Sequence, residues 1–193
     1  MPASINEFLI LSLLSLFFGA TQKLGDAHHE HGLSLFPHAA ILFGVLCGAI
    51  GAYLISFSSL LQATYLGPLI YWFYKRKIDC PQHIIAATIM LSAVAASIGK
   101  FEFPLLATIG IFAGYVCADF VKHRTCIQRI HLLSVFFRYR LHFHAIHGYF
   151  SFLSMSFYPS TALVFNLAGI ALAERLAKIP NHPIGTPSPN ERA

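Results

Sequence analysis

The chain has 193 residues, of which 56% are hydrophobic and only 11% are charged, and its formal charge is +5 at pH 7. Soluble proteins carry about 25% charged residues, and a soluble domain of this size has too small an interior to enclose so much apolar surface. The composition therefore argues against a soluble enzyme, a nucleic-acid-binding domain and a disordered chain. It predicts an all-α, polytopic integral membrane helical bundle.

The predicted elements are apolar stretches separated by short polar loops. A helix needs about 20 residues to cross about 30 Å of hydrocarbon, so the charge-free stretch 33–74 contains two spans and is divided near residues 56–59. We expect about five to six transmembrane helices. Their ranges are about 6–21, 37–57, 60–74, 83–99, 104–121 and 149–173.

The last stretch, 149–173, is interrupted by Pro159, so it is either one kinked span or a re-entrant pair. Residues 1–173 are expected to form a single transmembrane domain. The proline-rich segment 174–193 is expected to be a disordered tail.

The basic residues are concentrated in three loops, 21–36, 75–82 and 122–147, which hold nine of the thirteen Lys and Arg residues. Alternating spans place these loops on the same side of the membrane, whereas the turn after the fourth span holds only Lys100. Positive charge is typical of the cytoplasmic side, so the three loops are predicted to be cytoplasmic and to face anionic lipid.

Small residues recur every four positions on the second and fifth spans and give each span a narrow face. They are Ala40, Gly44, Gly48 and Ala52 on the second span, and Gly110, Gly114 and Ala118 on the fifth. Such faces let helices approach closely in lipid. We expect packing within the chain, or a homo-oligomer or larger membrane complex. Membrane lipids are the other expected partners, and no nucleic acid is expected.

The eleven histidines are the main functional clue, because the predicted topology places ten of them on the cytoplasmic face. Imidazole is a common ligand of zinc, copper and iron, and Asp26, Glu30 and Asp119 are available to orient it. The predicted metal ligands are His28, His31, His38, His123, His131, His144 and His147, with His142 in reserve. The alternative is a histidine- and arginine-rich anchor in the headgroup region.

The four cysteines show no C-x-x-C pair and no disulfide framework, so we interpret them as small apolar residues. They are Cys47, Cys80, Cys117 and Cys126.

Two segments resemble the membrane oxygenases of the fatty acid hydroxylase type, which include carotenoid hydroxylases. Residues 118–124 look like the Asp-…-His-Arg approach of that family, and residues 143–147 resemble its F-H-x-x-H-H stretch. His31-Gly32, with His38 seven residues after His31, resembles the early H-G-x5-H piece. The resemblance implies a di-iron centre held by cytoplasmic histidine clusters.

Three functions follow as hypotheses. The first is a metal-dependent, di-iron oxygenase that acts on a lipid or isoprenoid chain. Zinc is the alternative metal, and a zinc-dependent membrane hydrolase is a related option. Haem is not expected. The second is a non-catalytic integral subunit or assembly factor. The third is a small-solute or metal carrier, for which Gly67-Pro68 would break the third span. Whether the chain is an enzyme stays open at this stage, as do the catalytic residues.

Overall fold

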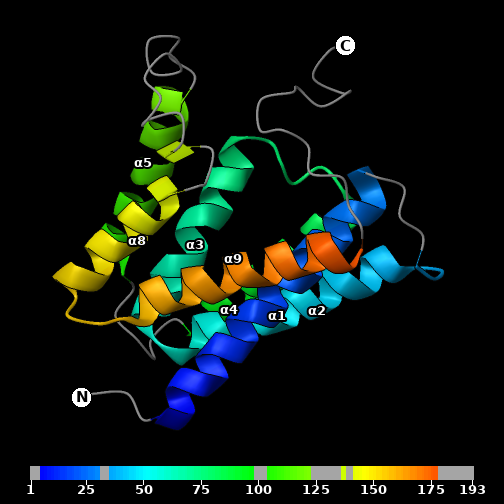
Figure 1. Ribbon diagram of the computed structural model, residues 1–193, viewed down its shortest axis with the longest axis horizontal. Coiled ribbons are helices and arrows are strands. Elements are labelled where there is room, and N and C mark those ends of the chain that lie inside the picture. The colour runs from blue at the N-terminus through cyan, green and yellow to red at the C-terminus, as the bar shows by residue number, and fades with distance from the viewer. Residues whose placement is uncertain (1–4, 31–34, 98–103, 123–135, 138–140, 178–193) are drawn as a thin grey trace.

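The computed structural model describes residues 5–30, 35–97, 104–122, 136–137 and 141–177. Within these ranges the chain is helical throughout apart from turns, so the all-α prediction is confirmed for the described residues (Figure 1). The helices are α1 (Ile5–Glu30), α2 (Ala39–Phe57), α3 (Ser59–Tyr74), α4 (Pro81–Ser97), α5 (Leu105–Lys122), α8 (Leu141–Leu153) and α9 (Tyr158–Leu176).

Three of these helices are long and apolar enough to cross a membrane: α1 over Ile5–His28, α2 and α5. The helix α4 is apolar but shorter. Large apolar side chains such as Leu13, Leu42 and Leu106 lie exposed on the outside of the bundle. Because a soluble protein rarely exposes so much apolar surface, the arrangement fits the helical membrane bundle expected from the composition.

The first helix is longer than the expected span 6–21. It continues through residues 22–30, which the sequence analysis assigned to a loop, and ends at Glu30. Asp26 and His28 therefore lie on the last turns of a helix. The buried residues Gly25 and Ala27 explain the extension, since they pack this end of α1 against its neighbours although Lys23, Asp26 and Glu30 make it polar.

The stretch around Pro159 forms a helical hairpin. The helix α8 begins at Leu141, inside the expected loop 122–147, and the chain turns at residues 154–157, where Met155 has a φ of 50°. Pro159 lies in the first turn of α9, where its missing N–H has no partner to lose. The break thus precedes the proline.

Contacts at both ends of each helix pair give its direction. In a parallel pair, the residue numbers of the contacts rise together along both helices. The parallel pairs are α1 with α9 (Phe8–Phe165 and Lys23–Glu174), α3 with α5 (Gly67–Ile111 and Lys75–Asp119) and α2 with α4 (Gly44–Gln82 and Gly51–Met90). The antiparallel pairs are α1 with α2 (Phe18–Gly51 and Gly25–Phe43), α3 with α4 (Gln62–Ser97 and Trp72–His83) and α5 with α8 (Gly110–Phe150 and Gly114–Ile146). Helices α1, α3, α5 and α9 therefore run one way, and α2, α4 and α8 run the other.

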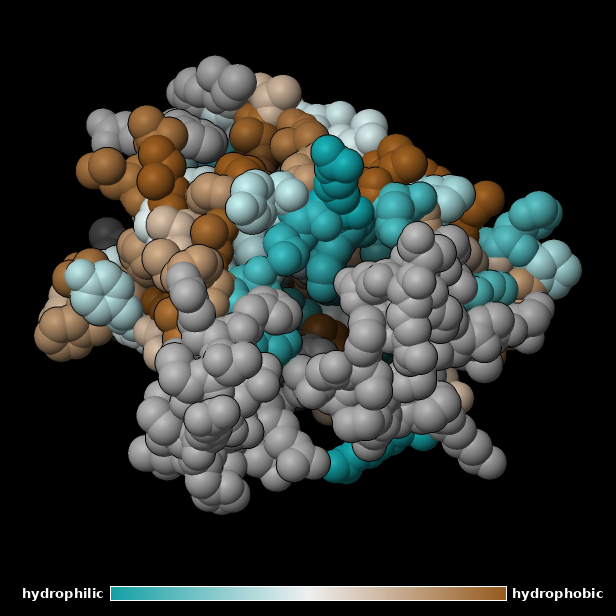
Figure 2. Space-filling view, turned by 90° about the horizontal axis from the view of Figure 1, so that it is seen from above, coloured by the Kyte–Doolittle hydropathy of each residue, from teal (hydrophilic) through white to brown (hydrophobic). Residues whose placement is uncertain are grey.

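These directions bring the polar helix ends together at one end of the bundle, which we name the charged end. It contains the C-terminal ends of α1, α3, α5 and α9 and the N-terminal ends of α2, α4 and α8. Figure 2 looks onto this end from above and shows hydrophilic residues gathered near its middle, with hydrophobic residues toward its edge. In the described part of the chain, its helices are tied together by the ion pairs Lys23–Glu174 at 3.5 Å, Lys75–Asp119 at 2.8 Å and Asp26–His83 at 2.6 Å.

The small-residue faces of α2 and α5 are used inside the chain. A Cβ atom built at Gly44 would lie 2.8 Å from the Cα of Gln82 on α4, and one built at Gly114 would lie 3.1 Å from the side chain of Ile146 on α8. Both glycines therefore allow close helix packing.

Candidate metal centre

The loop between α3 and α4 carries the best-defined group of metal-binding side chains at the charged end. The α3 helix ends in a turn in which Arg76 has a φ of 52° and the N–H of Lys77 donates to the carbonyl of Trp72. The chain then reaches Cys80, whose carbonyl accepts hydrogen bonds from the N–H groups of His83 and Ile84. The loop thereby begins α4, and His83 falls in its first turn, directly beside Cys80.

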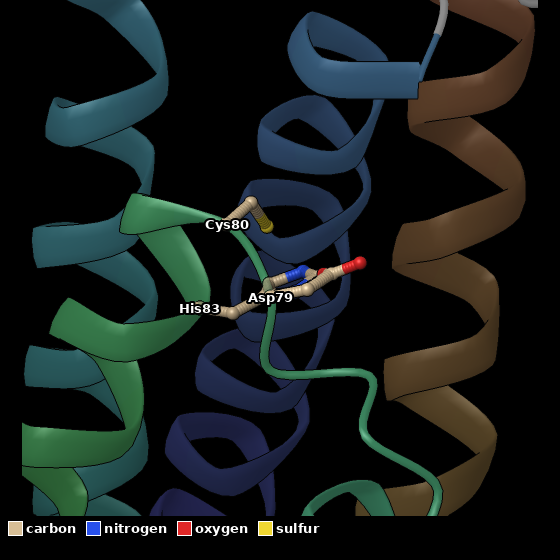
Figure 3. Close-up of side chains that lie close together, drawn as sticks. All are labelled: Asp79, Cys80 and His83. Carbon is tan, nitrogen blue, oxygen red and sulfur yellow. The ribbon is translucent and has the colours of Figure 1, made fainter. Parts of the chain in front are cut away.

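Asp79, Cys80 and His83 each present one ligand atom, and these atoms all lie within 4.8 Å of one another (Figure 3). The distance between His83 Nδ1 and Asp79 Oδ1 is 3.9 Å. The Cys80 side chain is fully buried, whereas the side chain of Asp79 is 65% exposed. The group therefore has a protein-facing side and a side that is open to the outside of the bundle.

Both ring nitrogens of His83 have partners. Nδ1 lies 2.9 Å from the carbonyl oxygen of Lys77, which only accepts, so Nδ1–H donates there. Nε2 lies 2.6 Å from the Asp26 carboxylate on α1. When Nε2–H donates to that carboxylate as well, the ring is an imidazolium that links α4 to α1.

The same geometry fits a metal ligand after the loss of one proton. A ligating histidine usually donates its second N–H to a carboxylate, which fixes the tautomer and the ring orientation. Asp26 is in that position behind Nε2. Nδ1 would then exchange its bond to Lys77 for a metal ion shared with Cys80 and Asp79.

The Cys80 thiol must also lose its proton to bind a metal. Burial is the main cause that raises its pKa to about 11, and the nearby carboxylates of Asp79 and Asp26 raise it further. The thiol is therefore protonated at neutral pH. Metal binding at this site is expected to release protons and to weaken as the pH falls, because the ligands must be deprotonated.

A small cavity lies behind His83, between α1, α2, α3 and α4. Its lining includes Thr21, Cys47, Trp72 and Gln82 as well as His83. It has room for about one water-sized molecule, so it is too small for an acyl chain or a metabolite. A substrate of a metal ion at Nδ1 would have to approach from the exposed side, where Asp79 lies.

Four of the predicted histidine ligands lie in the described residues, in one group at the facing ends of α1 and α2 and another on α8. His28 is half-buried on α1, and His38 is exposed just before α2 with a φ of 63°. His144 is half-buried and His147 is buried, both on α8. The remaining predicted ligands, His31, His123 and His131, lie outside the described residues.

The structure separates these two groups along the charged end. Figure 1 shows α8 at the left of the bundle and the C-terminal end of α1 at the right. Among the residues that the structure describes, three or more histidine, cysteine or acidic side chains offer clustered ligand atoms only at Asp79, Cys80 and His83. In this part of the chain, His28 and His144 therefore do not share a centre.

The sequence analysis did not select Asp79, Cys80 or His83 as ligands, although it placed His83 at the start of a span. The cysteines were judged by the C-x-x-C pattern, which Cys80 does not match. The informative signal was the mixed spacing Asp-Cys-x-x-His at the beginning of a helix. Asp26 was named as an orienting carboxylate, and it does contact a histidine, but that histidine is His83.

No protein-family model matches this chain, and neither the curated proteins nor the solved structures contain a match to it.

Proposed function

We propose that the chain is a multi-pass membrane protein that binds a zinc-type transition-metal ion at its charged end and acts on a substrate at the headgroup level. The observation that carries the proposal is the clustering of the Asp79, Cys80 and His83 ligand atoms within 4.8 Å, with Asp26 hydrogen-bonded to His83. Carboxylate, thiolate and imidazole are all ligands that zinc accepts.

The helix directions support a topology in which the charged end is cytoplasmic. Every Lys and Arg among the described residues lies at that end: Lys23, Lys75, Arg76, Lys77, Lys122 and Arg175. This asymmetry is what the positive-inside rule describes. Helices α1 to α5 then cross in alternating directions, and the α8–α9 hairpin enters and returns at the charged end.

Three protein ligands leave a fourth position free on a tetrahedral ion, as in catalytic zinc sites. A bound metal would supply Lewis acidity and a metal-bound water of lowered pKa. Asp26 would hold the His83 ring in place, buried Cys80 would fix the loop against the bundle, and exposed Asp79 would face the substrate side. The site is therefore better suited to metal-assisted hydrolysis than to oxygen chemistry.

Metal content tests this proposal directly. The full chain, purified in detergent and titrated with Zn²⁺, is expected to bind one ion per chain, and Cys80→Ser and His83→Gln are each expected to weaken binding at least about 10-fold. Cys117→Ser and His38→Gln are matched controls, because both residues are exposed and lie outside the cluster. Unchanged zinc binding in both cluster variants would contradict the proposal.

A di-iron oxygenase is the second candidate, and a specific observation favours it. The buried Nε2 atom of His28, near the end of α1, has no hydrogen-bond partner among the described residues, and a metal ion would satisfy it. This candidate predicts about two irons per chain and their loss in the His28→Ala variant. A protein that binds neither metal would instead fit a non-catalytic subunit.

A further inference from the structure

The turn between α8 and α9 carries large apolar side chains on its outside. We name the exposed residues Phe152, Leu153, Met155 and Phe157 the hairpin tip. The turn lies at the end of the bundle opposite the charged end, at the outer edge of the molecule (Figure 1). A turn in water is usually polar, whereas Met155, in the middle of this one, leaves 89% of its surface exposed. The tip continues the apolar exterior of the bundle, because Phe157 packs on Phe8 of α1 with ring centroids 6.1 Å apart.

The backbone of Met155 is strained as well. Its φ of 50° lies in the left-handed region, where a residue with a Cβ atom is disfavoured and glycine or asparagine is usual. The N–H of Met155 donates to the carbonyl of Phe152, and the N–H of Ser156 donates to the carbonyl of Ser151. This is the Schellman pattern that ends a helix. The cost of a methionine here is offset only if its side chain gains an apolar contact, and since the protein covers so little of it, that contact has to come from outside the chain.

The polar groups of the turn bond to one another and leave little for water. The N–H groups of residues 154, 155, 156, 158, 160 and 161 all donate inside the hairpin, and Pro159 has no N–H to satisfy. Ser151 of α8 accepts hydrogen bonds from the N–H and the hydroxyl of Ser160, at 3.0 and 2.9 Å. It thereby caps α9, whose own N-cap residue, Phe157, makes no side-chain hydrogen bond. Such internal pairing of backbone groups is what a lipid environment requires.

We propose that the hairpin tip is a lipid-binding surface, seated at the boundary between acyl chains and headgroups in the leaflet opposite the charged end. Residues 148–173 contain no charged side chain, so nothing in the hairpin opposes its entry into the bilayer. A helix rises about 1.5 Å per residue, so α9 covers about 24 Å between Tyr158 and the ion-paired Glu174, less than the roughly 30 Å of hydrocarbon. The tip therefore stops at the membrane boundary instead of projecting into water. Acyl chains cover apolar side chains and offer no hydrogen bonds, which matches a turn whose polar groups are already paired.

The surroundings of residue 155 in the full-length protein test the proposal. A nitroxide is attached to Met155→Cys in a background without native cysteines, in vesicles of phosphatidylcholine and phosphatidylglycerol. Its collisions are then measured with oxygen, which concentrates among acyl chains, and with a water-soluble nickel chelate. The ratio of oxygen to nickel collisions should be several-fold higher than at Lys77→Cys, the control at the charged end. Equal ratios at the two positions would overturn the proposal, and so would rare collisions with both reagents at residue 155, which would mean that a protein segment covers the tip.

Substitutions of Met155 distinguish lipid from water by the sign of their effect. Asparagine suits a left-handed backbone better than methionine does, so Met155→Asn should raise the melting temperature if the turn lies in water. In lipid the variant loses the apolar contact, and we expect it to melt about 2–4 °C below the wild type in lipid nanodiscs. Met155→Leu stays apolar and gains nothing in the backbone, so this matched control should melt within about 1 °C of the wild type. A Met155→Asn variant that melts at or above the wild-type temperature in the nanodiscs would overturn the proposal.

Discussion

Because α1 and α9 lie in close contact at Gly169, we predict that Gly169→Ala destabilises the protein. A Cβ atom built at this glycine would collide with the backbone carbonyl of Leu16 and would lie 2.9 Å from the backbone nitrogen of Ala20. Neither atom can turn aside as a side chain would, so Gly169→Ala must push the two helices apart. Overpacking of this kind costs about 1–3 kcal/mol.

Alanine also stabilises a helix by about 0.5–1 kcal/mol relative to glycine, and Gly148→Ala on α8 isolates this effect. Nothing lies within 4 Å of the corresponding Cβ position at Gly148. The difference between the two variants therefore measures the α1–α9 contact alone. Since about 1 kcal/mol shifts the melting temperature of a chain this long by about 2–4 °C, Gly169→Ala should melt about 2–12 °C below Gly148→Ala in the same detergent. Equal melting temperatures would mean that the helices do not touch at this residue.

Two other predictions concern the charged end. Asp26→Asn should lower zinc affinity about 10–100-fold, because it removes the carboxylate that orients His83. A competition titration against a zinc-binding dye measures the change. A variant with wild-type affinity would show that Asp26 does not support the site. In a background without native cysteines, Lys77→Cys should react with a membrane-impermeant thiol reagent only from the cytoplasmic side. Met155→Cys, in the exposed α8–α9 turn, should react only from the other side, and labelling of both from one side would refute the topology.

Much of the helical framework could be predicted from composition, because a backbone inside a lipid bilayer must satisfy its own hydrogen bonds. Apolar stretches of about 20 residues are forced into helices, and the boundaries expected for 37–57, 60–74 and 104–121 lie close to those of α2, α3 and α5. The basic loops likewise indicated which helix ends belong together. These features depend on local composition, so they can be predicted from a single sequence.

The extension of α1 and the start of α8 at Leu141 were not foreseen, because both depend on tertiary packing. Polar residues such as Lys23 and Asp26 lowered the apparent hydropathy of 21–30, yet their partners Glu174 and His83 are supplied by distant helices. The tightest helix contact also escaped the sequence analysis. Gly19 and Gly169 are isolated glycines on different helices, so neither forms the four-residue repeat that marked α2 and α5.

The described histidines lie toward one end of the bundle, but they do not gather into one site. Alternating helices bring His28, His83 and His147 toward the same end of the bundle, but each is held by packing of its own. His83 is fixed to α1 by Asp26, whereas the His147 ring bonds to the Phe143 carbonyl on its own helix and packs on Tyr115 of α5. An ion needs its ligands within a few ångströms, whereas topology fixes only which end of a helix they occupy. The lateral position of each helix, set by contacts such as Gly169 on Leu16, decides which histidines can act together.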